Sequence, residues 1–228
     1  MSISIFKIYG LQRTRTNYLQ KFIDINYENV IILSNVTGWK HGFVQETIDW
    51  SGSNWEETPE NARKHFDQNL LECKEYKSEI IESFDNKRVN FLFCFRNPYD
   101  NFLTMQEHAP DKNKFHIRFV QDWNCKNRDY LSFIKNNKNT YAIRFEDFVN
   151  ENKQKIFTDL KSKFNLKAKS KFYNDITNRI GPRLKITESQ FTNKEFNEEQ
   201  FTNEKLKKYF KNNLDFEVMS KLKYRIIE

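Results

Sequence analysis

Hydrophobic residues in this chain gather in short β-branched and aromatic runs, with longer stretches of helical spacing between them. Four runs predict strands, at residues 3–9 (ISIFKIY), 29–34 (NVIILS), 89–95 (VNFLFCF) and 140–145 (TYAIRF). The second run is almost continuously apolar, which is typical of a strand buried on both faces of a parallel sheet.

Helical patterns fill the intervals between these runs. They predict helices at residues 16–23 and 62–84, a helix opening at Pro98, and a helix at residues 115–136. Strands that alternate with helices indicate an α/β sandwich with a mainly parallel sheet. The length suits one domain over residues 1–228.

Polar clusters follow three of the predicted strands. Gly10–Arg15, Arg96–Asn97 and Glu146–Asp147 each come where an apolar run ends. Ligands of open α/β sheets bind beyond the carboxyl ends of the strands. We therefore expect the three clusters to lie at one edge of the sheet and to form the functional site.

The first cluster is a strand-to-helix turn that is rich in hydrogen-bond donors. Unpaired backbone N–H groups converge at such a turn and favour an anion. Arg13 adds a permanent cation, while Thr14, Thr16 and Asn17 add side-chain donors. The turn does not match G-x-x-x-x-G-K-[ST], the loop of ATP- and GTP-hydrolysing proteins. This mismatch disfavours ordinary metal-dependent phosphoryl transfer.

Composition narrows the class of ligand. A net charge of +7 and a pI near 9.1 suit an anionic ligand. The basic residues are dispersed and no RNA-binding aromatic signature occurs, so we do not expect a nucleic-acid partner. Three cysteines without metal-type spacing predict reduced thiols and a cytoplasmic protein. No apolar stretch reaches the length of a membrane span, and no signal peptide is recognisable.

Taken in order, the segments "GLQRTRTNYL", "RNPYDNFLT" and "YAIRFEDFV" resemble the signature segments of sulfotransferases that use 3′-phosphoadenosine 5′-phosphosulfate (PAPS). The resemblance implies a three-layer α/β fold of the P-loop nucleotide-binding type. It also implies an enzyme that transfers a sulfuryl group from PAPS to an acceptor hydroxyl or amine without a metal. The expected acceptor is a small molecule or a carbohydrate.

The resemblance also implies roles for particular residues. Arg13 falls where many members of the family carry a lysine that contacts the phosphosulfate. The residues that it assigns to PAPS binding are Arg13, Thr14, Arg15, Thr16 and Asn17 in the loop, Arg96 and Thr104 at the 3′-phosphate, and Arg183 in a late basic loop. For Arg183 the match is loose, and a plain basic turn is the better explanation.

Arg15 departs from the family pattern, which usually has glycine at this position. Glycine adopts positive φ without steric cost, whereas arginine does not. The sequence therefore predicts either ordinary dihedral angles at Arg15 or a reshaped loop.

A general base is expected near the sulfur, because the acceptor must lose a proton. The segment "GWKHGF" resembles the place where the family carries such a base, and it indicates His41, assisted by Lys40. Glu46 is the reserve candidate. Two other functions stay open, a non-catalytic nucleotide- or polyanion-binding protein and a metal-dependent nucleotide kinase. The sequence does not indicate an oligomeric state.

Overall fold

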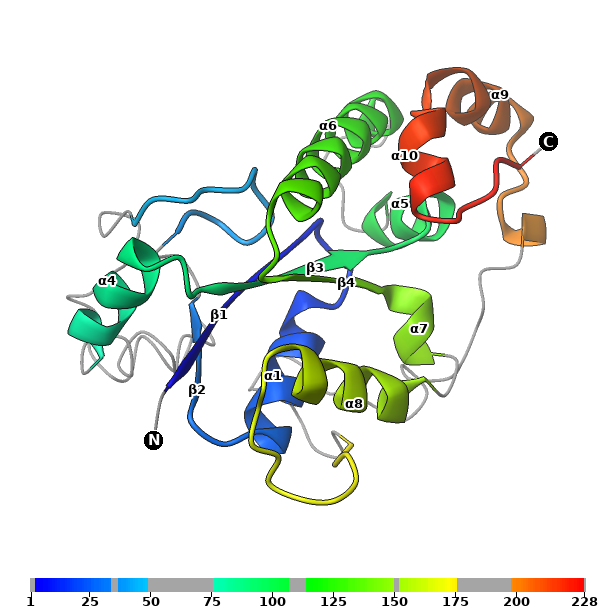
Figure 1. The fold of residues 1–228 in the computed structure, drawn as a ribbon. Helices are drawn as coiled ribbons and strands as arrows, with labels where there is room; N and C mark the ends of the chain where they lie inside the picture. The colour runs from blue at the N-terminus through cyan, green and yellow to red at the C-terminus, as the bar shows by residue number, and fades with distance from the viewer. Residues whose placement is uncertain are drawn as a thin grey trace, which may run out of the picture.

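The computed structural model of this chain describes residues 3–33, 37–48, 76–106, 114–149, 152–175 and 198–227. Four strands form one sheet in the order β2-β1-β3-β4, and every neighbouring pair is parallel (Figure 1). Their bounds are Ser4–Gly10 for β1, Val30–Leu33 for β2, Asn90–Phe95 for β3 and Thr140–Arg144 for β4. The predicted parallel α/β architecture is confirmed.

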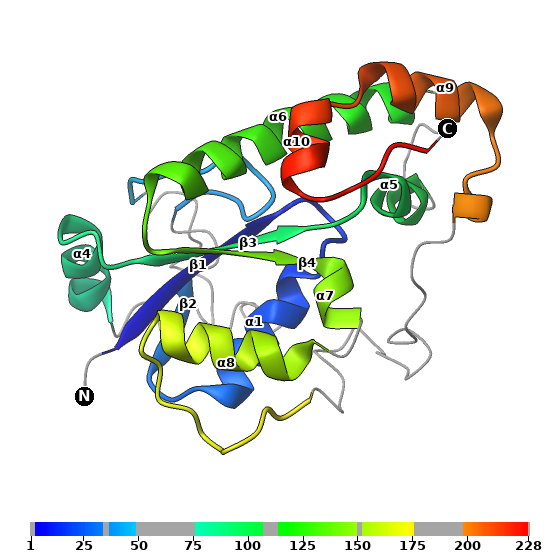
Figure 2. The same ribbon diagram turned by 45° about the vertical axis from the view of Figure 1, so that its right-hand side comes forward.

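Helices cover both faces of this sheet and give the described parts of the chain three layers (Figures 1 and 2). One face carries α1 (Thr16–Asn26), α7 (Phe145–Val149) and α8 (Lys153–Lys163). The other carries α4 (Lys77–Asp85), α5 (Pro98–Gln106), α6 (Phe115–Asn136), α9 (Glu204–Asn213) and α10 (Phe216–Lys221). A short 3₁₀ helix (Glu198–Gln200) precedes α9.

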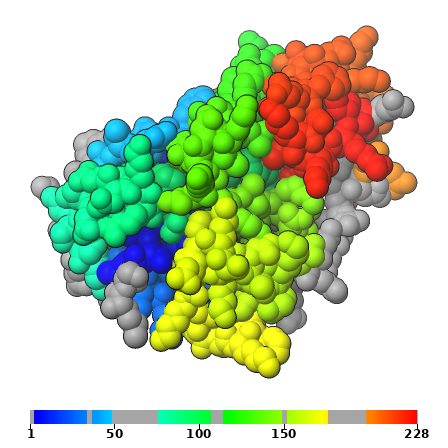
Figure 3. All heavy atoms as spheres, viewed as in Figure 1, coloured from blue at the N-terminus to red at the C-terminus, as the bar shows by residue number. Residues whose placement is uncertain are grey.

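Two apolar cores explain why the strands are so hydrophobic. Successive side chains of a strand point to opposite faces, and here both faces are buried. Tyr9 and Phe93 face the core that contains Trp123 of α6, whereas Leu92 faces the core that contains Phe22 of α1. In the space-filling view, helices α6 and α8 lie over the strands, and little of β1 is visible (Figure 3).

The predicted elements match the observed ones closely. Helix α6 has the predicted bounds, and α1 runs three residues further than predicted, to Asn26. Only the last part of the predicted helix at 62–84 is described, as α4; residues 62–75 lie outside the described residues. In the part of the chain that the structure describes, no helix is long and apolar enough to cross a membrane.

The strand order places a topological switch point between β1 and β3. The chain leaves β1 for β2 on one side and then crosses to β3 on the other side. The two strand ends meet there, because Gly10 pairs with Cys94 in the parallel register. Connections that diverge from adjacent strands leave a crevice, and open α/β sheets bind their ligands in it.

Candidate functional site

The loop between β1 and α1 contains two residues with left-handed backbone conformation. Arg13 and Arg15 lie in the left-handed region, with φ of 65° and 66°, whereas Thr14 between them does not. The Thr14 N–H donates to the Leu11 carbonyl, at 3.2 Å, and so closes the turn between the two arginines. The first possibility predicted for Arg15, ordinary dihedral angles, is wrong, because Arg15 adopts the left-handed conformation that glycine usually takes.

Gly10 allows this loop to fold back on the end of β3. A Cβ atom at Gly10 would lie 2.6 Å from the Thr14 Oγ1 and 2.7 Å from the Cys94 carbonyl oxygen. The buried Thr14 hydroxyl donates to the Leu11 carbonyl, at 2.7 Å. In this structure Thr14 thus stabilises the turn, and its side chain does not face solvent.

The first turn of α1 is left open to an anion. Arg15 is the N-cap residue and provides no side-chain capping bond, and the first turn contains no acidic residue. The Nζ of Lys40 reaches this turn and donates to the Asn17 Oδ1. The positive end of the helix dipole and the Lys40 ammonium therefore act in the same place.

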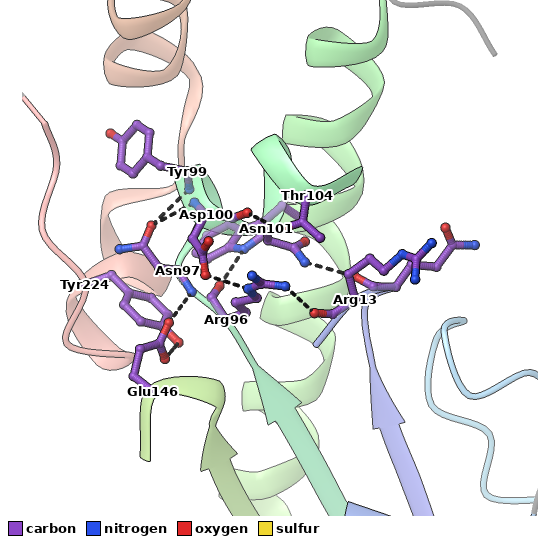
Figure 4. Close-up of polar contacts among 11 residues, drawn as sticks. Arg13, Arg96, Asn97, Tyr99, Asp100, Asn101, Thr104, Glu146 and Tyr224 are labelled. Carbon is purple, nitrogen blue, oxygen red and sulfur yellow. Dashed lines mark hydrogen bonds and ion pairs between the residues drawn. The ribbon is translucent and has the colours of Figure 1, made fainter. Parts of the chain in front are cut away.

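The β3–α5 junction lies against the loop (Figure 4). Arg96 donates from Nε to the Asp100 carboxylate, at 2.6 Å, and from Nη1 to the Arg13 carbonyl, at 2.7 Å. The Thr104 hydroxyl donates to the Asp100 carbonyl, at 3.0 Å. The Arg96 side chain is only 10% exposed. Arg96 thus joins the loop to α5.

Two residues that sequence reasoning missed fix this junction. Asn101 is fully buried and its Nδ2 donates to the Gln12 carbonyl, at 2.9 Å. Tyr224, near the end of the chain, donates to the Glu146 Oε2, at 3.0 Å, while the Glu146 Oε1 accepts from the Asn97 N–H, at 2.8 Å. Burial raises the pKa of Glu146, and these hydrogen bonds partly offset the rise. No local pattern around Asn101 or Tyr224 signals these contacts.

His41 lies beside the end of β1. Its Nδ1 is 2.6 Å from the Gly10 carbonyl, which assigns the ring proton to Nδ1 and leaves the lone pair on Nε2. Burial is the main cause that lowers the pKa of His41 to about 4, and the positive charges of Lys40, Lys126 and Lys7 act in the same direction. The imidazole is therefore neutral at physiological pH. The indole of Trp39 contacts it edge-on, with ring centroids 5.0 Å apart.

The segment that carries His41 is held by buried polar side chains. Lys7, in the middle of β1, donates from Nζ to the Gly38 carbonyl, at 2.7 Å. Tyr9 donates to the Thr37 carbonyl, at 2.6 Å, and Tyr130 of α6 to the Gly42 carbonyl, at 2.7 Å. A lysine inside an apolar strand was the one available signal of this support, and sequence reasoning did not use it.

Phe145, the first residue of α7, was also missed. The Cζ of Arg96 lies 4.2 Å from its ring centroid, and the Cζ of Arg15 lies 4.8 Å from it. Two guanidinium groups, one from each side of the switch point, therefore share one aromatic ring.

The structure thus brings most of the predicted site residues to the carboxyl ends of β1 and β3: Arg13, Thr14, Arg15, Thr16, Asn17, Lys40, His41, Arg96 and Thr104. Glu46 is exposed on the segment that carries His41, and Arg183 lies outside the described residues. Among the described residues, no group of three or more His, Cys, Asp or Glu side chains could hold a metal ion.

No family model and no curated protein matches this chain. Among solved structures, it is similar to a sulfotransferase domain from the curacin biosynthetic pathway, with 12% sequence identity and a TM-score of 0.49. The match covers 100% of this chain and 99% of that chain. A likeness at this level does not indicate a function.

Proposed function

We propose that this protein is a sulfotransferase that moves a sulfuryl group from PAPS to an acceptor hydroxyl or amine. The observation that carries the proposal is the pairing of two anion-binding features at the switch point. One is the loop with left-handed Arg13 and Arg15 that leads into the N-terminus of α1, and the other is Arg96 with Thr104. PAPS carries a 5′-phosphosulfate and a 3′-phosphate on its ribose, so it would contact both features.

The residues of the site fit such a donor. The loop N–H groups and the open N-terminus of α1 suit the 5′-phosphosulfate, and Arg96 suits the 3′-phosphate. Gly10 lets the backbone approach closely at the point where the two features meet. Bound PAPS would supply a sulfuryl group whose transfer leaves negative charge on the departing phosphate.

The protein's part in the reaction is positioning and charge stabilisation. Arg13, Lys40 and the helix N-terminus would stabilise the charge that develops on the departing phosphate. His41 would accept the acceptor's proton at Nε2, because its Nδ1–H is held by Gly10. A pKa near 4 keeps this base available at neutral pH but makes it weaker than an ordinary histidine.

A non-catalytic nucleotide- or polyanion-binding protein is the second candidate. Arg96 and Thr104 both have partners within the protein, Asp100 and the Arg13 carbonyl. A site that needs such contacts for its own stability could bind an anion without reacting with it. Turnover of PAPS with a panel of hydroxyl acceptors separates the two candidates.

The nucleotide itself is tested by thermal denaturation with 3′,5′-bisphosphoadenosine, AMP, and ATP with magnesium. A ligand that binds only the native state raises its stability by mass action. We expect the bisphosphate to raise the melting temperature well above the value with AMP. Equal stabilisation by the two nucleotides would refute the 3′-phosphate assignment, and preference for ATP with magnesium would favour a kinase.

Two variants connect the result to the site. Arg96→Gln should remove most of the difference between the bisphosphate and AMP, since a charge-assisted contact is worth about 1.5–3 kcal/mol. Because this change also leaves Asp100 without its cation, Thr104→Val serves as the milder variant. It keeps the side-chain shape and the Arg96–Asp100 pair, and should reduce the same difference to a smaller extent.

A further inference from the structure

We propose that Arg15 and Arg96, both placed on the ring of Phe145, bind one and the same phosphate group, the 3′-phosphate of the nucleotide. The inference rests on the proposed function and extends it. Arg15 stands at the position where the loop pattern usually has glycine. The inference places its side chain at the 3′-phosphate, whereas the rest of its loop serves the 5′-phosphosulfate. It also assigns Phe145 as the residue that positions the two guanidinium groups.

The geometry points across the switch point. Arg15 belongs to the loop after β1, yet its side chain extends toward Phe145, which follows β4. Arg96 arrives at the same ring from the end of β3, with its Cζ 4.2 Å from the centroid, against 4.8 Å for Arg15. A guanidinium that rests on an aromatic ring keeps its N–H groups directed outward at its edge.

Electrostatics favours a dianion between these two groups. Burial lowers the pKa of Arg15 from its ordinary value, and the positive charge of Arg96 lowers it further. Asp100 offsets one of the two charges through its bond to the Arg96 Nε. Both oxygens of the nearby Glu146 carboxyl already accept hydrogen bonds, from Asn97 and Tyr224. A phosphate that contacts both guanidinium groups would relieve their mutual repulsion.

The backbone of Arg15 is consistent with this role. Left-handed φ costs a non-glycine residue roughly 1–2 kcal/mol, and glycine would remove that cost. Arg15 holds this conformation, with φ of 66° and ψ of 31°. An arginine in this conformation costs conformational free energy. Cation–π contacts with Phe145 and Tyr18, together with a bound phosphate, would compensate for that cost.

The chain provides a matched control for the test. Arg13 has the same residue type, the same loop and nearly the same φ, 65°, but its side chain is exposed, and its contact with Arg96 is made by its backbone carbonyl. Arg13→Gly and Arg15→Gly therefore remove the same charge and relieve the same kind of backbone strain. Arg15→Asn removes the guanidinium as well but keeps a residue that tolerates the left-handed region.

The experiment measures the affinities of the full-length variants for 3′,5′-bisphosphoadenosine and for AMP by calorimetry. We expect the preference for the bisphosphate to fall roughly 10- to 100-fold in Arg15→Gly and Arg15→Asn. In Arg13→Gly both affinities should fall together and the preference should stay. Phe145→Leu should reduce the preference, and Phe145→Tyr should retain it.

The outcomes separate the inference from the function on which it rests. If the wild-type protein prefers the bisphosphate and both Arg15 variants keep that preference, the inference is overturned and the proposed function stands. If the wild-type protein does not prefer the bisphosphate, the proposed function fails and the inference with it. An unchanged preference in Phe145→Leu would remove Phe145 from the site.

Discussion

At the scale of single residues, His41 shows how an environment can fix the chemistry of a side chain. One ring nitrogen is held by the Gly10 carbonyl, and burial with three nearby lysines lowers the pKa to about 4. The same surroundings that free Nε2 to accept a proton also make it a weak base. We therefore expect a catalytic contribution near the lower end of what general bases provide.

The first prediction concerns the rate. His41→Asn keeps a donor for the Gly10 carbonyl, because the asparagine Nδ2 takes the place of the imidazole Nδ1. It should lower the rate of sulfuryl transfer about 10²-fold and leave the affinity for the bisphosphate nearly unchanged. In the wild-type pH–rate profile, the acidic limb should fall near pH 4 and disappear in the variant. Near-full activity with that limb intact would transfer the role of base to Glu46.

The second prediction is that the His41 imidazole makes the free energy of unfolding depend on pH. Its pKa in the folded state, about 4, lies below the ordinary value of 6.5, so the unfolded chain binds more protons between these values. Neutral His41 therefore contributes fully to the free energy of unfolding above pH 6.5. This contribution, at most about 3 kcal/mol, is lost as the pH falls to 4. Denaturant titrations of the wild-type protein and of His41→Asn should diverge in this window. Parallel curves would mean that His41 is not buried as a neutral group.

The two arginines with positive φ give a third prediction. Replacement of either arginine by glycine removes the steric strain of a side chain in the left-handed conformation. This should stabilise the unliganded protein by up to about 1 kcal/mol. Arg15→Gly also loses the contacts with Phe145 and Tyr18, so it should gain less than Arg13→Gly. Chemical denaturation measures both values. A larger gain for Arg15→Gly would indicate that its ring contacts contribute nothing.

At the scale of elements, the site depends on how the β3–α5 junction is held. Glu146 follows β4, accepts from the backbone of Asn97 at the start of α5, and accepts from Tyr224 in the C-terminal segment. The Asn97 Oδ1 accepts from the Tyr99 N–H, at 3.0 Å, within the first turn of α5. The end of the chain therefore supports the helix that carries Asp100 and Thr104.

This arrangement predicts unequal effects for two substitutions. Glu146→Ala leaves two donors without their acceptor in a buried place, and should lower the free energy of unfolding by about 2–5 kcal/mol. Tyr224→Phe removes one donor and leaves the Asn97 contact in place, and should cost about 1–2 kcal/mol. Equilibrium unfolding in urea compares them. A Tyr224→Phe variant as unstable as Glu146→Ala would show that the C-terminal contact, rather than the Asn97 contact, is the important one.

At the scale of the whole molecule, a net charge of +7 attracts anions of any kind, and salt screens that attraction. At equal ionic strength, a specific anion-binding site raises the melting temperature more with one anion than with another. Millimolar sulfate should therefore raise the melting temperature more than sodium chloride of matched ionic strength. Arg96→Gln should lose this excess while it keeps the general response to salt; identical responses to both salts would argue against the site.

The sequence by itself determined the four strands, helices α1, α5 and α6, and most of the candidate residues. Strands β1, β2, β3 and β4 were readable because each is a compact apolar run, and α6 was readable because its apolar residues recur at helical spacing over 22 residues. The polar clusters after the strands were visible for the same reason, since they interrupt the apolar runs. These signals are local, because residues that are adjacent in the sequence are enough to show them.

Only the tertiary structure decided how these parts meet. The order β2-β1-β3-β4 creates the switch point that joins the Arg13–Arg15 loop to Arg96, and strand order depends on packing between distant segments. Phe145, Asn101 and Tyr224 gain their roles only through contacts with residues far away in the chain. The left-handed conformation of Arg15 is likewise set by its surroundings, because an isolated arginine favours negative φ.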